Sequence, residues 1–159
     1  MTGCDFDVTK IVFHLFRLIM QINPYLSFKG DCEKAFKFYE QCLGGRLGGI
    51  FRYAGTPLAN EVPADWHDKV MHGSLTVGGL VLMGGDVAPD RYQEPKGFSL
   101  SLQIESTADA ERVFHELAKD GTVMMPLEQT FWAARFGMVV DRFGIPWLIN
   151  CEGSDRASD

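Results

Sequence analysis

The chain has 159 residues, of which 46% are hydrophobic and 23% are charged. This composition is typical of one globular domain, or of two small modules that share a core. Fifteen Lys and Arg against 21 Asp and Glu give a formal net charge of −6, and the sequence contains no basic run. A protein that follows a phosphate backbone needs clustered positive charge. Nucleic acid is therefore not an expected partner.

Residues 1–19 precede the first clear strand pattern and are predicted to be an extension outside the fold, with a packed N-terminal helix as the alternative. Their apolar stretch is short and is interrupted by His14 and Arg17. A membrane-spanning helix needs about 20 apolar residues. A signal peptide would begin with basic residues, whereas this chain begins with Asp5 and Asp7. We therefore expect no membrane partner.

The cysteines lie at positions 4, 32, 42 and 151 and form no C-x-x-C pair. This spacing matches neither a zinc finger nor a disulfide framework. Free thiols are typical of a reducing compartment and are commonly buried. The sequence thus predicts a cytoplasmic protein with buried cysteines.

An internal repeat determines the predicted architecture. The first copy opens with an extended run over 22–28, followed by a helix pattern over 32–43 with Asp31 as its expected N-cap. The second copy opens with strict alternation over 98–104, followed by a helix pattern with Thr107 as its expected cap. Glycines end both helix patterns, which is typical of a left-handed stop.

Three further strand patterns follow each helix. They cover roughly 46–53, 70–77 and 80–85 in the first copy, and roughly 122–131, 135–141 and 145–151 in the second. We therefore predict an α+β fold in which two tandem βαβββ modules form curled mixed sheets around a cavity. The domain covers 20–153, with module one at 20–86, a linker at 87–96, module two at 97–153, and a tail at 154–159.

Several short runs of residues recur together in one protein family. They are NPYLSF at 23–28, AFKFY at 35–39, VMHG at 70–73, MP at 125–126, FW at 131–132 and FGMVVDRFGIPWLIN at 136–150. In these runs the chain resembles the PhnB-like branch of the vicinal oxygen chelate superfamily, which contains glyoxalase, bleomycin-resistance and dioxygenase proteins. Members of this branch are sometimes labelled demethylubiquinone methyltransferases. The resemblance implies the glyoxalase fold and a homodimer, but the chain has no motif for a methyl-donor cofactor.

The resemblance also implies a divalent metal held by His and Glu on the first and last strands of each module. The corresponding residues here are Pro24, Met83, Ser99 and Leu148. Proline and leucine have no donor atom, serine binds such ions poorly, and methionine suits soft Cu(I). We therefore predict no metal and no cofactor at these positions.

His72 is the candidate catalytic residue. A rearranged metal site is an alternative, in which His72 and Glu128 would converge with either His67 or Asp65. A lone strand histidine can equally be a structural residue. His115 lies outside the apolar stripe of its helix and is expected to face solvent.

Strand alternation predicts the lining of the cavity. Leu100 and Leu102 are expected to pack under the helix, while the polar residues between them face the cavity. The predicted ligand pocket contains Leu26, Phe28, Tyr53, His72, Ser74, Ser99, Ser101, Gln103, Phe131, Trp132, Leu148 and Asn150. An apolar lining with a few polar groups is typical of a small-molecule site. The alternative is that these polar faces are simply exposed to water.

The sequence therefore favours a dimeric protein that binds a small, partly apolar molecule in a metal-free cavity, for example to sequester a toxic compound. The alternative is a small-metabolite enzyme of lyase, transferase or dioxygenase type, with a rearranged metal site or with His72 as acid or base. A scaffold domain without a cavity is the third possibility. The chain contains no G-x-S-x-G, P-loop or H-E-x-x-H motif, so the residues assign no reaction.

Overall fold

The computed structural model describes residues 21–153, so the predicted extension at 1–19 and the tail at 154–159 lie outside the described residues. Module one contains β1 (Tyr25–Phe28), α2 (Cys32–Leu43), β2 (Arg46–Arg52), β3 (Val70–Val77) and β4 (Leu80–Asp86). Its strands form one four-stranded sheet in the order β1-β4-β3-β2. β1 runs parallel to β4, and the other two pairs are antiparallel. The insertion between β2 and β3 forms two short 3-10 helices, η1 (Pro57–Glu61) and η2 (Ala64–Trp66).

Module two repeats this topology. It contains β5 (Leu100–Gln103), α3 (Thr107–Ala118), β6 (Thr122–Glu128), β7 (Arg135–Val140) and β8 (Pro146–Cys151), in the sheet order β5-β8-β7-β6. β5 is again the parallel strand. The predicted α+β fold of two βαβββ modules with mixed sheets is confirmed.

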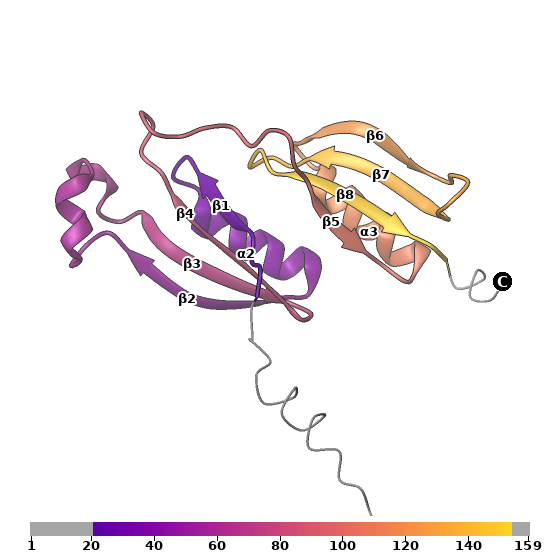
Figure 1. Ribbon diagram of the computed structural model, residues 1–159, viewed down its shortest axis with the longest axis horizontal. Coiled ribbons are helices and arrows are strands. Elements are labelled where there is room, and N and C mark those ends of the chain that lie inside the picture. The colour runs from indigo at the N-terminus through magenta and orange to yellow at the C-terminus, as the bar shows by residue number, and fades with distance from the viewer. Residues whose placement is uncertain (1–20, 154–159) are drawn as a thin grey trace, which may run out of the picture.

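Each helix covers one face of its own sheet, because its apolar stripe packs against the strands. In module one this packing is close enough to require glycine in β4. A Cβ atom at Gly84 would lie 2.7 Å from the Leu26 carbonyl oxygen and 3.1 Å from the Phe36 ring. In Figure 1 both helices lie behind the strands, so the uncovered faces of the two sheets lie side by side toward the reader.

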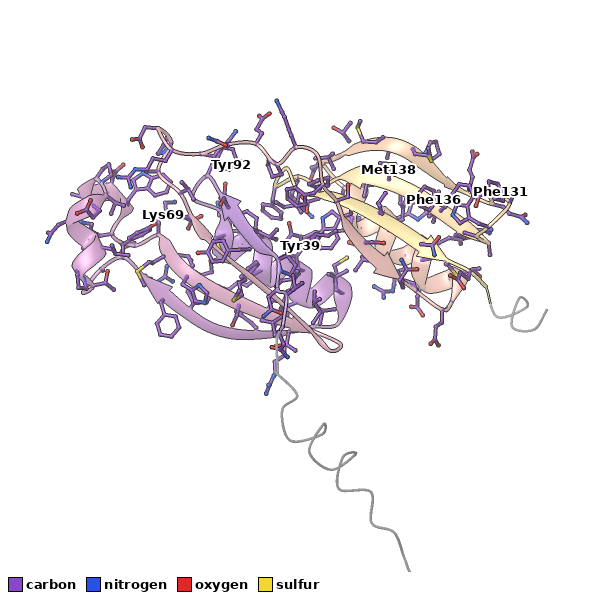
Figure 2. The ribbon with its side chains drawn as sticks, in the orientation of Figure 1. Tyr39, Lys69, Tyr92, Phe131, Phe136 and Met138 are labelled. Atoms are coloured by element: carbon purple, nitrogen blue, oxygen red, sulfur yellow. The ribbon has the colours of Figure 1, made fainter. Side chains whose placement is uncertain are left out.

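The modules share one hydrophobic core, which is joined around a buried carboxylate. Asp141 accepts hydrogen bonds from the Tyr39 hydroxyl at 2.6 Å and from the Trp147 indole at 2.8 Å. Tyr39 belongs to α2 of module one and Trp147 to β8 of module two, and their ring centroids lie 5.2 Å apart. Figure 2 places Tyr39 between the two sheets. The joint therefore fixes how the two uncovered faces sit relative to each other.

The helix caps differ from the sequence prediction. Asp31 occupies the N-cap position of α2 but its side chain makes no capping hydrogen bond. The Cys32 amide donates to the Asp86 carboxylate at 2.9 Å instead. In α3, Ser106 is the N-cap and accepts from the Asp109 amide, while Thr107 is already helical. The predicted N-cap position of Asp31 is therefore confirmed, but the helix amide bonds to a carboxylate of β4, which is distant in sequence, and not to the Asp31 side chain.

Within residues 21–153, no helix is long and apolar enough to cross a membrane.

Candidate functional site

Three aromatic rings form a row across the uncovered face of the module-one sheet. Tyr25 on β1, His72 on β3 and Phe51 on β2 make up this aromatic row. The His72 ring centroid lies 5.9 Å from that of Tyr25 and 6.3 Å from that of Phe51, with interplanar angles of 27° and 30°. Rings at these separations and angles make favourable offset contacts. The imidazole is thus held between two rings.

A glycine makes the long reach of Tyr25 possible. β4 lies between β1 and β3, and the Tyr25 ring crosses it at Gly85, where a Cβ atom would lie 2.9 Å from the tyrosine oxygen. The hydroxyl donates to the Met71 carbonyl at 3.4 Å. Burial is the main cause that raises the pKa of Tyr25, so this hydroxyl stays a protonated donor at neutral pH.

His72 differs from the other described histidines because its ring nitrogens have no hydrogen-bond partner among the described residues. His67 pairs through Nε2 with the Ala59 carbonyl at 3.0 Å, and His115 pairs through Nδ1 with the Glu111 carbonyl at 2.7 Å. The nitrogens of His72 make no hydrogen bond with any residue of 21–153. Since a neutral imidazole carries one donor and one acceptor, His72 is held by its ring faces and offers both nitrogens to a ligand.

The uncovered face of the module-two sheet carries a chain of polar side chains. The Gln103 amide donates to the Ser101 hydroxyl at 3.0 Å, and the Asn150 amide donates to the Gln103 oxygen at 2.7 Å. Gln103 and Asn150 also line a cleft of about 480 Å³ together with Glu105 and Glu152. These predicted pocket residues therefore lie together, but their polar atoms are largely engaged with one another.

An aromatic cluster lies beside this chain. The Trp132 ring centroid is 4.6 Å from Phe131 and 5.3 Å from Phe136. Figure 2 shows Phe131, Phe136 and Met138 over the module-two sheet. Phe136 and Met138 alternate with the buried Gly137 and Val139 on β7, so the cluster extends onto the uncovered face.

The structure corrects the predicted lining from the first strand. Leu26 and Phe28 are 1% exposed and belong to the hydrophobic core under α2, where the Phe28 ring packs edge-on against Phe36. Tyr25 and Ser27 alternate with them and lie on the uncovered side. The alternation was right and its phase was wrong, because a four-residue strand gives too little pattern to fix which face is buried.

The other predicted pocket residues lie on the two uncovered faces or next to the ends of the strands. Tyr53 follows β2, and its hydroxyl donates to the Asp86 carbonyl at 2.9 Å. Ser74 and Leu148 lie half-buried on the uncovered faces of β3 and β8, whereas Ser99 precedes β5. The set predicted as one pocket is therefore spread over both faces and the insertion.

The residues at the inherited metal positions do not fit a divalent metal of this superfamily. In module one, the Met83 amide donates to the Pro24 carbonyl at 2.9 Å, so these two positions are neighbours without an imidazole or carboxylate. The rearranged alternative is not assembled, because residues 21–153 contain no group of three or more His, Cys, Asp and Glu side chains able to hold an ion. His72 and Glu128 belong to different sheets.

The described cysteines are free and buried, as predicted for Cys32, Cys42 and Cys151, while Cys4 lies outside the described residues. Burial raises the pKa of the Cys42 thiol to about 11. A thiol reacts as its thiolate, so Cys42 is not activated as a nucleophile.

The family follows from the match to known sequences. A family model described as the Glyoxalase/Bleomycin resistance protein/Dioxygenase superfamily matches residues 21–149. The chain belongs to this superfamily. Protein YjdN of Escherichia coli (strain K12) is 32% identical over 139 residues, which cover 82% of this chain and 95% of YjdN.

Solved structures support the same relationship. The protein PA1353 from Pseudomonas aeruginosa is 49% identical, with a TM-score of 0.77 over 85% of this chain and 99% of that protein. The PhnB protein from Bacillus cereus, provisionally described as a 3-demethylubiquinone-9 3-methyltransferase, is 27% identical, with a TM-score of 0.71 over 83% and 99% of the two chains. The resemblance to the PhnB-like branch is thus confirmed.

Proposed function

We propose that this member of the superfamily binds a small, partly apolar molecule at its uncovered sheet faces and holds it without chemical change, as in sequestration. The observation that carries the proposal is the aromatic row, in which Tyr25 and Phe51 hold His72 while its nitrogens stay available. Aromatic surface combined with a few free polar groups is the usual composition of a small-molecule site. If His72 only stabilised the fold, its ring nitrogens would not need to stay without hydrogen bonds.

Binding is favoured over acid–base catalysis by the surroundings of His72. A catalytic histidine is normally oriented by a hydrogen bond from its second nitrogen to a carboxylate or carbonyl group. Within residues 21–153, no such partner bonds to His72, whereas His67 and His115 each have one. An enzyme that uses His72 as acid or base remains the second candidate, and its free nitrogens are the observation in its favour.

The bound molecule needs a cover, and we propose that a second copy of the chain supplies it. Small-molecule sites bury about 70–90% of their ligand, which one open sheet face does not achieve. Both faces of this chain expose large apolar side chains, including Phe51 at 58% and Met125, opposite Met138, at 43%. Extended exposed apolar surface marks interaction sites. A homodimer would enclose the ligand between facing sheets.

We further propose that the site functions without a metal and that the protein is cytoplasmic, where its buried thiols remain reduced. The unsuitable residues at the inherited positions support the first statement. Elemental analysis of the purified protein, followed by thermal-shift titration with Mn, Ni, Zn and Fe, tests it. We expect no stoichiometric metal. A stoichiometric ion that His72→Ala removes would contradict the proposal.

Native mass spectrometry of the purified protein tests the central proposal. Wild type should carry the mass of two chains and retain a small molecule, or capture one from a metabolite extract, at one per chain. His72→Ala should lose at least tenfold in occupancy. The control His115→Ala changes an exposed histidine of α3 and should keep wild-type occupancy. Failure of every extract component to bind wild type would overturn the proposal, as would equal occupancy in both variants.

A further inference from the structure

Polar side chains continue along β3 from the aromatic row. Ser74 and Thr76 follow His72 at two-residue intervals, so the three share the uncovered face. The Ser74 hydroxyl lies against β2 at Gly48, where any Cβ atom would overlap it. All three side chains are half-buried, and they make no hydrogen bond with the described part of the chain. Their donors are available to a ligand on this face.

Arg46, the first residue of β2, lies next to Thr76. It pairs with Thr76 in the β2–β3 register, and directly opposite residues of antiparallel strands project from the same face. Arg46 therefore lies on the uncovered face of the module-one sheet, together with the aromatic row and the free hydroxyl groups.

The arginine is unusual in having no counter-charge. Among the lysines and arginines of residues 21–153, Arg46 and Lys96 make no ion pair or hydrogen bond with described residues, whereas the others contact an acidic side chain or a backbone carbonyl. In a chain of net charge −6, an unpaired arginine is a distinctive feature. Its planar guanidinium binds a carboxylate through two parallel hydrogen bonds.

The spacing sets the size of the ligand. His72 and Thr76 are four residues apart on one strand, which corresponds to about 13 Å. Ser74 lies midway between them on the strand, and the long side chain of Arg46 projects from the same face opposite Thr76. A molecule with a ring at one end and an anionic group a few bonds away spans this distance.

We propose, on the basis of the function proposed above, that the ligand is an aromatic carboxylate. Its ring packs on the aromatic row of Tyr25, His72 and Phe51. Its carboxylate accepts hydrogen bonds from Arg46 and from the hydroxyl groups of Ser74 and Thr76. The aromatic row alone would accept any flat apolar molecule, and the unpaired cation beside it selects the acid.

The test measures the affinity of full-length protein for three probes by isothermal titration calorimetry. The probes are 3-(2-naphthyl)propanoate, its primary amide, and 3-cyclohexylpropanoate. Wild type should bind the naphthyl acid at least tenfold more tightly than either other probe, because the amide lacks the charge and the cyclohexyl acid lacks the aromatic ring. Arg46→Gln should remove the preference for acid over amide.

Lys96→Gln is the matched control, since it removes the other unpaired cation from the linker and leaves the face intact. It should keep the wild-type preference. An amide that binds wild type as tightly as the acid would overturn the inference, as would equal losses in Arg46→Gln and Lys96→Gln. If wild type binds none of the probes while native mass spectrometry shows a retained molecule, the ligand class is wrong and the proposed function stands. If neither experiment shows a ligand, both the proposed function and the proposed ligand class are wrong.

Discussion

The two uncovered sheet faces come from the same βαβββ unit, yet their polar groups are used differently. On the module-two face, Gln103 bonds to both Ser101 and Asn150. On the module-one face, His72 and Ser74 bond to no described residue. Polar groups that satisfy each other gain little from a ligand, whereas free ones gain a partner. Under the proposed function, module one therefore carries the free recognition groups, whereas module two contributes its aromatic cluster and polar groups that are already paired.

This division depends on a rigid joint, because the faces lie side by side only while the modules stay fixed. The joint is asymmetric. Asp141 of module two accepts bonds from Tyr39 of module one and from Trp147, and it also accepts from the Phe143 and Ile145 amides. Breaking it should disturb both faces, whereas changes within one sheet should disturb one.

Asp141→Ala should have the largest effect. It leaves several buried donors without an acceptor, and each such group costs about 1–3 kcal/mol. We expect the free energy of unfolding to fall by about 3–5 kcal/mol, measured by urea denaturation. Asp90→Ala, which removes an exposed carboxylate of the linker, should change it by less than about 0.5 kcal/mol. Equal effects of the two changes would show that the modules are not held together at Asp141.

Gly84→Ala should disturb the module-one sheet alone. Its new methyl group would meet the Leu26 carbonyl oxygen at 2.7 Å, and such overpacking costs about 1–3 kcal/mol. The control Gly79→Ala has nothing within 4 Å of its Cβ position and should change the free energy of unfolding by about 0.5 kcal/mol or less. A tolerated Gly84→Ala would mean that α2 does not pack this closely on β4.

Tyr39→Phe should have a smaller effect, because it removes one hydrogen bond to Asp141 and leaves the other three donors in place. The expected loss in the free energy of unfolding is about 1 kcal/mol. The tryptophan bands of the near-ultraviolet circular dichroism spectrum should be retained, since the ring keeps its contact with Trp147, while the contribution of the tyrosine itself is lost. If Tyr39→Phe lowered the free energy of unfolding as much as Asp141→Ala, the tyrosine hydroxyl alone would account for the stability of the joint.

The helix caps give the smallest expected difference between the modules. Ser106→Ala removes a side-chain cap from α3 and should lower the free energy of unfolding by about 1 kcal/mol. Asp31→Ala removes no cap from α2 and only an exposed pair with Lys34, so it should cost less than about 0.5 kcal/mol. Thermal and urea unfolding of both variants would measure this, and a larger loss for Asp31→Ala would contradict the assigned caps.

Much of the fold was predictable from residues that repeat. The helix stripe at 32–43 and the strand at 70–77 coincide with α2 and β3, because both patterns are long and strongly periodic. The phase of β1 was not predictable, since four residues alternate equally well in either orientation and only the contact of Phe28 with Phe36 decides it.

The candidate site was predictable only in part. His72 and Ser74 were expected on one face, but neither Tyr25 nor Arg46 was identified. Tyr25 joins the site across Gly85 of another strand, and Arg46 joins it through the register with Thr76. Both relations connect residues far apart in the sequence. The signal that would have pointed to Tyr25 is the glycine pair at 84–85, which permits a large ring to cross a strand.

A chemical-shift map of the ¹⁵N-labelled protein titrated with 3-(2-naphthyl)propanoate tests most directly whether the module-one face binds the ligand. The largest perturbations should occur at the amides of Arg46, Phe51, His72 and Ser74, together with a shift of the His72 imidazole resonances. Perturbations confined to the module-two cleft at Gln103 and Asn150 would contradict the assignment of recognition to module one.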